Sequence, residues 1–167
     1  FALGLALIVA AAFFVRQPGY MDAYYYFGGA RELVRGHGFT EPYVWNYLDR
    51  PTTLPHPSHL YWMPLTSLVA AASMLVFGDS FRAAQLPFIL LAALLPPLSA
   101  ALAWRLAGHR ERAITAGLLA LFPGFYFTFW PNTDAFALFG LLGAGALIAA
   151  WRGGETGRAR WCLLAGL

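Results

Sequence analysis

Apolar residues are gathered into long runs that are separated by shorter polar segments. The runs cover residues 1–15, 60–77, 83–104, 113–130, 135–151 and 161–167. A membrane-spanning helix needs about 20 predominantly apolar residues. The pattern therefore predicts an all-α, polytopic membrane protein in which 83–104, 113–130 and 135–151 are spans.

The first and last apolar runs are shorter than a complete span. We interpret residues 1–15 as a truncated span and residues 161–167 as the start of a further one. The alternative for 1–15 is a signal peptide, but no small-x-small cleavage site followed by a soluble domain is visible. We therefore expect residues 1–167 to be one transmembrane domain, a fragment of a longer membrane protein.

The composition agrees with a membrane protein. Hydrophobic residues make up 59% of the chain and charged residues 11%, whereas a soluble domain carries about 25% charged residues. The mean hydropathy is +0.57. The net charge of +3 does not indicate a nucleic-acid partner, because the arginines lie in short loops beside apolar runs. The single cysteine, Cys162, excludes an intramolecular disulfide framework.

Arginine density predicts the orientation of the chain. The loops 105–112 and 152–160 contain three arginines each, so the positive-inside rule places both in the cytoplasm. The long segment 16–59 is balanced by acids and is predicted to be an external loop. The turn 130–134 lies between the two cytoplasmic loops, separated from each by one span, and must also be external.

The predicted orientation leaves one apolar run too many. An odd number of spans must lie between the external loop and 105–112, yet both 60–77 and 83–104 are available. We expect 60–77 to lie along the membrane surface or to be re-entrant. It begins with Tyr61 and Trp62, which are residue types enriched at membrane interfaces, and it contains several polar residues.

A polar segment at residues 20–36 has the spacing of an amphipathic helix. Its apolar and aromatic positions recur at helical intervals: Tyr20, Ala23, Tyr24, Phe27, Ala30 and Val34. Gly36 and Gly38 are predicted to end it. Such a helix fits the external membrane surface, and it would hold Asp22 at the membrane boundary just beyond the first apolar run.

Four external polar residues are candidates for chemistry, and each has a structural alternative. Asp22 and Asp134 are the external acids that adjoin spans, but Asp22 is also favourable in the first turn of a helix. Asp134 can serve as an N-cap or first-turn residue. His56 and His59 can be solvated loop residues. A zinc site is not supported, because no third or fourth ligand is clustered with the histidines.

Two further features have ordinary structural interpretations. The three consecutive tyrosines at 24–26 are more typical of an interfacial anchor than of a sugar-binding platform. Arg31 and Glu32 are expected to form a surface ion pair, which contributes little to stability.

Three segments, taken in order, resemble a known superfamily. "MDAYYYFGGARELVRGHGF" is similar to the first external loop of the C-type membrane glycosyltransferases, which use polyprenyl-phosphate sugars. "HPSHLYWMP" resembles the His-(Lys)-Pro-Pro-Leu-x-Tyr-Trp element of protein O-mannosyltransferases and aminoarabinose transferases, although Pro57-Ser58-His59 stands in place of its Lys-Pro-Pro. "AGLLALFPGFYFTFWPNTDAFALFGLL" resembles a region of oligosaccharyltransferase catalytic subunits, in which an external acid precedes a span. The resemblance covers about residues 1–151.

The resemblance implies a function. It predicts the N-terminal part of a multi-pass membrane enzyme that moves a sugar from a polyprenyl-phosphate donor to an acceptor on the external face, with inversion. If the source is a prokaryote, the membrane is the plasma or inner membrane. Asp22 is the expected catalytic base. The expected substrate-binding residues are Asp134, His56, His59, Arg50, Tyr61 and Trp62.

The resemblance leaves open whether the enzyme requires a divalent cation. Oligosaccharyltransferase-like members bind one through acids from both external loops, whereas mannosyltransferase-like members work without it. If Mg²⁺ or Mn²⁺ is used, Asp22 and Asp134 are the candidate ligands. The sequence departs from the family pattern here, since Asp22 is followed by Ala23 instead of Glu, and Asp134 by Ala135.

Two other functions compete with glycosyl transfer. A non-catalytic membrane subunit, which acts as a scaffold or binds lipid, would need Asp22 and Asp134 only as helix-terminus residues. A transporter is disfavoured, because the predicted spans carry no ionisable group at mid-membrane. Convergence of Asp22 and Asp134 in one solvent-reachable cavity would favour the enzyme.

Overall fold

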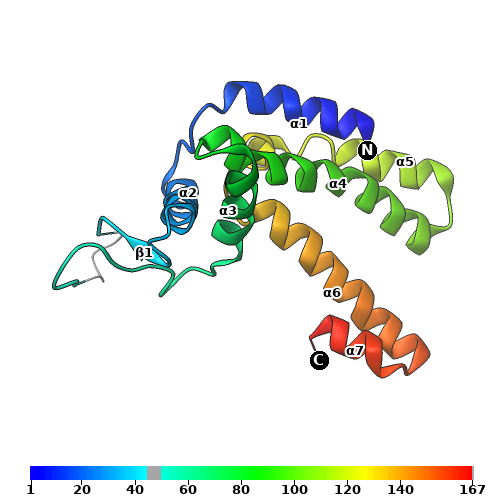
Figure 1. Cartoon of the computed structure of the whole chain (residues 1–167). Coiled ribbons are helices and arrows are strands. Elements are labelled where there is room, and N and C mark those ends of the chain that lie inside the picture. Colours follow the sequence, from blue (N-terminus) through cyan, green and yellow to red (C-terminus); the bar gives the residue numbers. More distant parts are fainter. Residues whose placement is uncertain (45–49, 167) are drawn as a thin grey trace.

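The computed structural model describes residues 1–44 and 50–166, and most of this part of the chain is helical (Figure 1). The elements in chain order are α1 (Ala2–Phe14), α2 (Met21–Val34), β1 (Thr40–Glu41), β2 (His56–Pro57), α3 (Leu65–Phe77), α4 (Phe81–Ala107), α5 (Arg110–Leu119), the 3₁₀ helix η1 (Gly124–Thr128), α6 (Phe136–Thr156) and α7 (Ala159–Ala165). The predicted helical fold is confirmed, with one short antiparallel β1–β2 pair added to it.

Among the described residues, two helices are long and apolar enough to cross a membrane. They are α4, with 27 residues, and α6, with 21. The helices α1 and α3 have 13 residues each. At 1.5 Å per residue such a helix is about 20 Å long, which is less than the roughly 30 Å of a bilayer core. Helix α3 occupies most of the run 60–77, which the sequence predicts to lie along the membrane surface or to be re-entrant.

The predicted span 113–130 is wrong as a single helix. Helix α5 ends at Leu119, and the chain turns through Pro123 and Gly124 into η1. Proline lacks an N–H and disfavours helical geometry in the residue before it. Gly124 has a positive φ of +63°, which favours glycine. This bend places η1 beside α1 instead of extending α5.

The predicted loop 152–160 is also partly wrong, because α6 continues through it to Thr156. The helix ends at Gly157, which is in the left-handed region. Helix α7 then packs back against α6 (Figure 1). A Cβ on Gly153 would lie 3.1 Å from the Sγ of Cys162, so the absence of a side chain at Gly153 permits this close approach.

Helix α1 lies along α4 and is fastened to it at its C-terminal end. The guanidinium of Arg82 donates hydrogen bonds to the carbonyls of Ala12, Phe13 and Val15. The amide of Gln85 donates to Val15 at 3.3 Å. Carbonyls in the last turn of a helix have no partner within the helix, so these α4 side chains satisfy them. They thereby fix the point at which the chain leaves α1 for α2.

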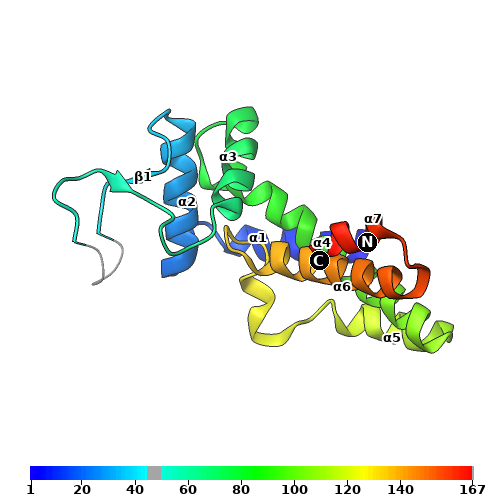
Figure 2. The same ribbon diagram turned by 90° about the horizontal axis from the view of Figure 1, so that it is seen from below.

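Helices α2 and α3 lie side by side and pack on the start of α4 (Figure 2). Small side chains dominate the buried contact, which comprises Ala30, Ala70, Ala71, Met74, Ala83, Ala84, Phe88 and Leu138. Small residues let helix backbones approach closely, as is typical of helix packing in membranes.

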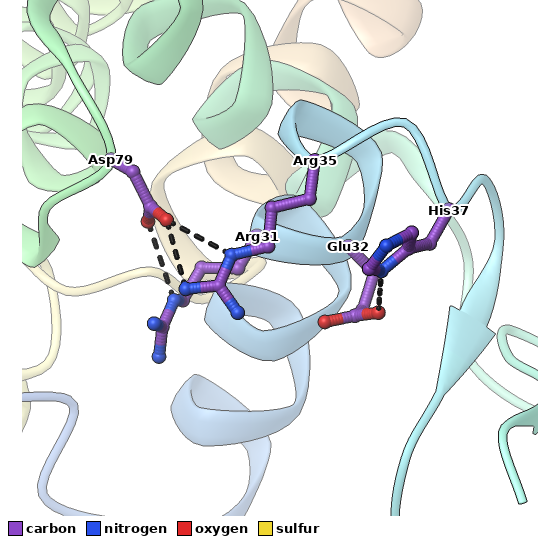
Figure 3. Close-up of polar contacts among 5 residues, drawn as sticks. All are labelled: Arg31, Glu32, Arg35, His37 and Asp79. Carbon is purple, nitrogen blue, oxygen red and sulfur yellow. Dashed lines mark hydrogen bonds and ion pairs between the residues drawn. The ribbon is translucent and has the colours of Figure 1, made fainter.

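The predicted Arg31–Glu32 ion pair is wrong. The two side chains point to different partners on either side of α2 (Figure 3). Arg31 and Arg35 both form ion pairs with Asp79, at 3.3 and 3.0 Å, which links α2 to the turn between α3 and α4. Glu32 is buried and accepts from the ring of His37 at 2.8 Å. Adjacent helical residues diverge by about 100°, so tertiary neighbours decide their contacts.

Candidate functional site

The turn between η1 and α6 is buried against the beginning of α2. The side-chain amide of Asn132 donates to the carbonyl of Pro18 at 2.6 Å. The hydroxyl of Thr133 donates to the carbonyl of Ala23 at 2.9 Å. Both side chains are almost fully buried. These bonds bring Asp134 to the connection between α1 and α2, more than 100 residues away in sequence.

Asp134 is buried, with 6% of its surface exposed, and both of its oxygens accept hydrogen bonds. Its Oδ2 accepts from the phenol of Tyr20 at 2.5 Å, and its Oδ1 from the backbone N–H of Ala135 at 2.5 Å. Burial raises the pKa of Asp134, although the two hydrogen bonds act in the opposite direction. Burial and the bond to Asp134 also hold the pKa of Tyr20 far above its ordinary value, so Tyr20 remains a protonated donor.

Asp22 lies close enough to Asp134 for their charges to interact. It is half-buried in the first turn of α2. Its charge is the smaller cause, after burial, of the raised pKa of Asp134. Both carboxylates also raise the pKa of Tyr26 to about 12, again after burial. Tyr20, Asp22, Tyr26 and Asp134 therefore form one electrostatic cluster, which we name the acid cluster.

A groove of about 550 Å³ adjoins the acid cluster. One wall is the α1–α2 connection, residues 14–20, and the other is formed by Thr128, Phe129 and Asn132. The ring of Tyr20 lines the groove and lies 4.8 Å from that of Phe129, centre to centre. Neither Asp22 nor Asp134 is among the lining residues. The groove thus reaches the cluster at Tyr20.

His59 lies elsewhere, over the middle of α2. Its Nε2 contacts the Ser67 hydroxyl at 2.9 Å, and that hydroxyl donates to the carbonyl of Tyr26. The Ser67 oxygen must then accept from Nε2–H, and the Nδ1 of the neutral ring accepts from Ser58 at 2.7 Å. Burial lowers the pKa of His59, which keeps the ring neutral in this arrangement.

His56 is a buried residue of the β1–β2 pair. Its Nε2–H donates to the carbonyl of Tyr43 at 3.0 Å and lies 3.4 Å from the Glu41 carboxylate. His56 also lines a second hollow, of about 410 Å³, together with Arg50 and Tyr61. Trp62 is not part of that lining and is 39% exposed. Three of the sequence-predicted residues therefore meet here.

The structure divides the sequence-predicted residues into two groups. Asp22 and Asp134 belong to the acid cluster, whereas the histidines, Arg50 and Tyr61 lie around the later part of the first loop. Gly29, which contacts His59, is two helical turns from Asp22, or about 10 Å along α2. Sequence reasoning missed Tyr20 as the partner of Asp134, because its helical spacing indicated only an apolar helix face.

No protein-family model, curated protein or solved structure matches the chain.

The acid cluster has few oxygens to offer a divalent cation. Mg²⁺ is usually bound by one or two carboxylates together with waters and substrate phosphates, and the cluster offers two carboxylates, one of which already accepts two hydrogen bonds. Within the described residues, no group of three or more His, Cys, Asp or Glu side chains is placed to hold a metal ion. A divalent cation bound by Asp22 and Asp134 stays a prediction, and the mechanism proposed below uses no metal-dependent step.

Proposed function

We propose that this chain is part of a polytopic membrane glycosyltransferase that moves a sugar from a polyprenyl-phosphate donor to an acceptor on the external face, with inversion. The observation that carries the proposal is the meeting of Asp22 with the Asp134–Tyr20 pair beside an open groove. A lipid-linked phosphosugar places its tail in the bilayer and its head at the interface, so a base for it must stand at that boundary.

Asp22 is the base in this proposal. It is the more exposed of the two acids and forms no side-chain hydrogen bond with a described residue. It accepts the proton of the acceptor hydroxyl as the oxygen attacks the anomeric carbon and the donor phosphate leaves. General base catalysis of this kind contributes about 10²–10⁴-fold. Asp134 has a different role, because Tyr20 and Ala135 occupy its oxygens. It positions Tyr20 at the edge of the groove.

Arg16 is the group best placed to meet the donor phosphate. It is exposed, lines the groove and forms no ion pair with any described residue. A guanidinium binds phosphate oxygens in a bidentate manner and stabilises the negative charge of a leaving phosphate. In the proposed topology, α4 and α6 cross the membrane, and the groove and acid cluster face the external side.

The test is the transfer activity of the full-length protein with a panel of polyprenyl-phosphate sugars. Asp22→Asn is expected to lower transfer by about 100-fold or more, in accordance with the contribution of a general base. The matched control is Asp79→Asn, the same replacement at an acid outside the cluster, which should retain most of the activity. Near-normal transfer by Asp22→Asn, at normal expression, refutes the assignment.

A non-catalytic membrane subunit is the second candidate. The observation in its favour is that the groove reaches Tyr20 but neither carboxylate, which suits a purely structural acid pair. It predicts that the wild-type protein transfers no sugar from any donor of the panel. A non-catalytic subunit also predicts that Asp134→Asn lowers the stability of the protein, with no transfer activity in either the variant or the wild type.

A further inference from the structure

A second groove lies between α4 and α6, towards their C-terminal ends. It has a volume of about 630 Å³ and is lined by Leu98, Leu102 and Ile148 among other apolar residues. Trp104, Arg105 and Arg152 also line it. Asp134 precedes α6, and Arg152 comes 16 residues after the first residue of that helix, so the groove is about 24 Å from the acid cluster along α6. It is a separate site.

The charge at this groove is positive. The guanidinium of Arg105 lies 4.4 Å from the ring centre of Trp151 and 3.7 Å from a carboxylate oxygen of Glu155. Arg152 lies 5.0 Å from the ring centre of Trp161 and forms no ion pair with a carboxylate of the described residues. Two arginines and one glutamate leave one positive charge in excess, and Arg152 is the cation that lacks a carboxylate partner.

The groove combines apolar lining residues with two arginines. It lies between α4 and α6, the two described helices that are long and apolar enough to span a membrane. Trp104 and Trp151 are partly exposed beside the arginines, and tryptophan is enriched at the lipid headgroup level. An acyl chain suits the walls formed by Leu98, Leu102 and Ile148, while a lipid phosphate suits the arginines. Basic pockets between spanning helices on the cytoplasmic side recognise anionic headgroups in this way.

We infer that the α4–α6 groove binds an anionic phospholipid of the cytoplasmic leaflet, with its phosphate at Arg152 and Arg105 and an acyl chain between the helices. The inference rests on the membrane placement in the proposed function and is independent of glycosyl transfer. Each of the two guanidinium groups lies over a neighbouring tryptophan ring, and a cation that is already positioned loses less entropy when the lipid binds.

The experiment measures retained lipid by native mass spectrometry of the full-length protein released from nanodiscs. The nanodiscs contain equal amounts of phosphatidylglycerol and phosphatidylcholine with identical acyl chains. Arg105→Gln/Arg152→Gln removes both groove cations. Arg110→Gln/Arg112→Gln removes the same charge from exposed positions at the start of α5 and is the matched control. Ala101→Trp fills the groove and keeps both arginines, since Ala101 is an exposed lining residue.

We expect wild-type protein to retain phosphatidylglycerol at least tenfold over phosphatidylcholine. The groove double variant and Ala101→Trp should lower this preference tenfold, while the α5 control variant should change it less than twofold.

An equal loss of preference in both double variants would show that anionic lipid is attracted to the arginines of the surface in general, and it would overturn the inference. So would an unchanged preference in Ala101→Trp. Absence of any bound lipid in wild type overturns it as well. Retention does not depend on sugar transfer, so the proposed function can fail separately.

Discussion

The phenol of Tyr20 donates a hydrogen bond to the carboxylate of Asp134, 114 positions away in the chain, with an O–O distance of 2.5 Å. This bond joins the connection that follows α1 to the turn that precedes α6. Tyr20 also lines the groove, and the charge of Asp22 acts on both partners of the bond. The position of the proposed base relative to the groove therefore depends on a contact between two loops.

Removal of the Tyr20 hydroxyl should destabilise the protein. Tyr20→Phe leaves a buried oxygen of Asp134 without its donor, and an unsatisfied buried acceptor costs about 1–3 kcal/mol. The measurement is unfolding by denaturant in detergent micelles. Tyr24→Phe is the control, because Tyr24 is 45% exposed, and a surface change of this kind is expected to stay within about 0.5 kcal/mol. Equal effects of the two variants would contradict the assigned role of the bond.

Gly29 should not tolerate a side chain. A Cβ at this position would lie 2.6 Å from Cε1 of His59 and 3.0 Å from Oγ of Ser67. The ring of His59 cannot move freely, because both of its nitrogens are hydrogen-bonded. Gly29→Ala is therefore expected to cost about 1–3 kcal/mol of unfolding free energy by overpacking.

The matched control for Gly29 is Gly143→Ala in α6. No atom lies within 4 Å of the position of its added Cβ. Alanine is favoured over glycine in a helix by up to about 1 kcal/mol, so this variant should be neutral or slightly stabilising. A stabilising effect of Gly29→Ala would show that His59 does not pack on α2.

His59 should make stability fall in mild acid. Burial lowers its pKa in the folded state below the ordinary value of 6.5, so the unfolded chain takes up the proton first. The contribution of His59 is complete above about pH 6.5 and is lost as the pH falls towards the folded-state pKa. His59→Asn should remove this part of the pH dependence, and asparagine tolerates the φ of 59° found at this residue.

Thermal unfolding between pH 5 and 7.5 measures the effect of His59. The informative quantity is the difference in slope between wild type and His59→Asn, since other titrating groups are common to both. His109→Asn, at an exposed residue between α4 and α5, should leave the wild-type slope intact. Identical slopes for wild type and His59→Asn would sink the prediction.

The ion pairs around Asp79 should contribute modestly and depend on salt. Asp79→Asn removes the common partner of Arg31 and Arg35, whose side chains are 41% and 43% exposed. Pairs this exposed contribute about 0.2–1 kcal/mol each. The loss should appear at low ionic strength and shrink in 1 M salt, where the Debye length is about 3 Å. Glu111→Gln, at an exposed acid of α5, is expected to show no such salt-dependent loss.

The spacing of apolar residues predicted α2, and the long apolar runs predicted α4 and α6. The helix expected at 20–36 is α2, the run 83–104 lies within α4, and the run 135–151 coincides with α6 from its second residue on. The run 113–130 was wrongly predicted as one span because it is apolar throughout. The interruption of the helix depends on two residues within it, Pro123 and Gly124. Strands of two residues, such as β1 and β2, are too short to produce a periodic signal.

The sequence predicted the two acids of the candidate site, but not the residues that bond to them or bring them together. The position of Asp22 and Asp134 beside apolar runs indicated a common boundary. The bonds that bring them together run from Asn132 and Thr133 to backbone carbonyls, and such contacts leave no mark in local sequence. The helical spacing of Tyr20 likewise gave no sign that it binds Asp134.

The buried turn at Asn132 and Thr133 has a consequence for biosynthesis. Helix α2 leaves the ribosome more than 100 residues before the turn that satisfies its Ala23 carbonyl and the nearby Pro18 carbonyl. During that interval the nascent chain carries this end of α2 in an incomplete state. Completion of this part of the fold is thus a late event, and a chain that ends between α5 and Asn132 would leave the Pro18 and Ala23 carbonyls without these two donors.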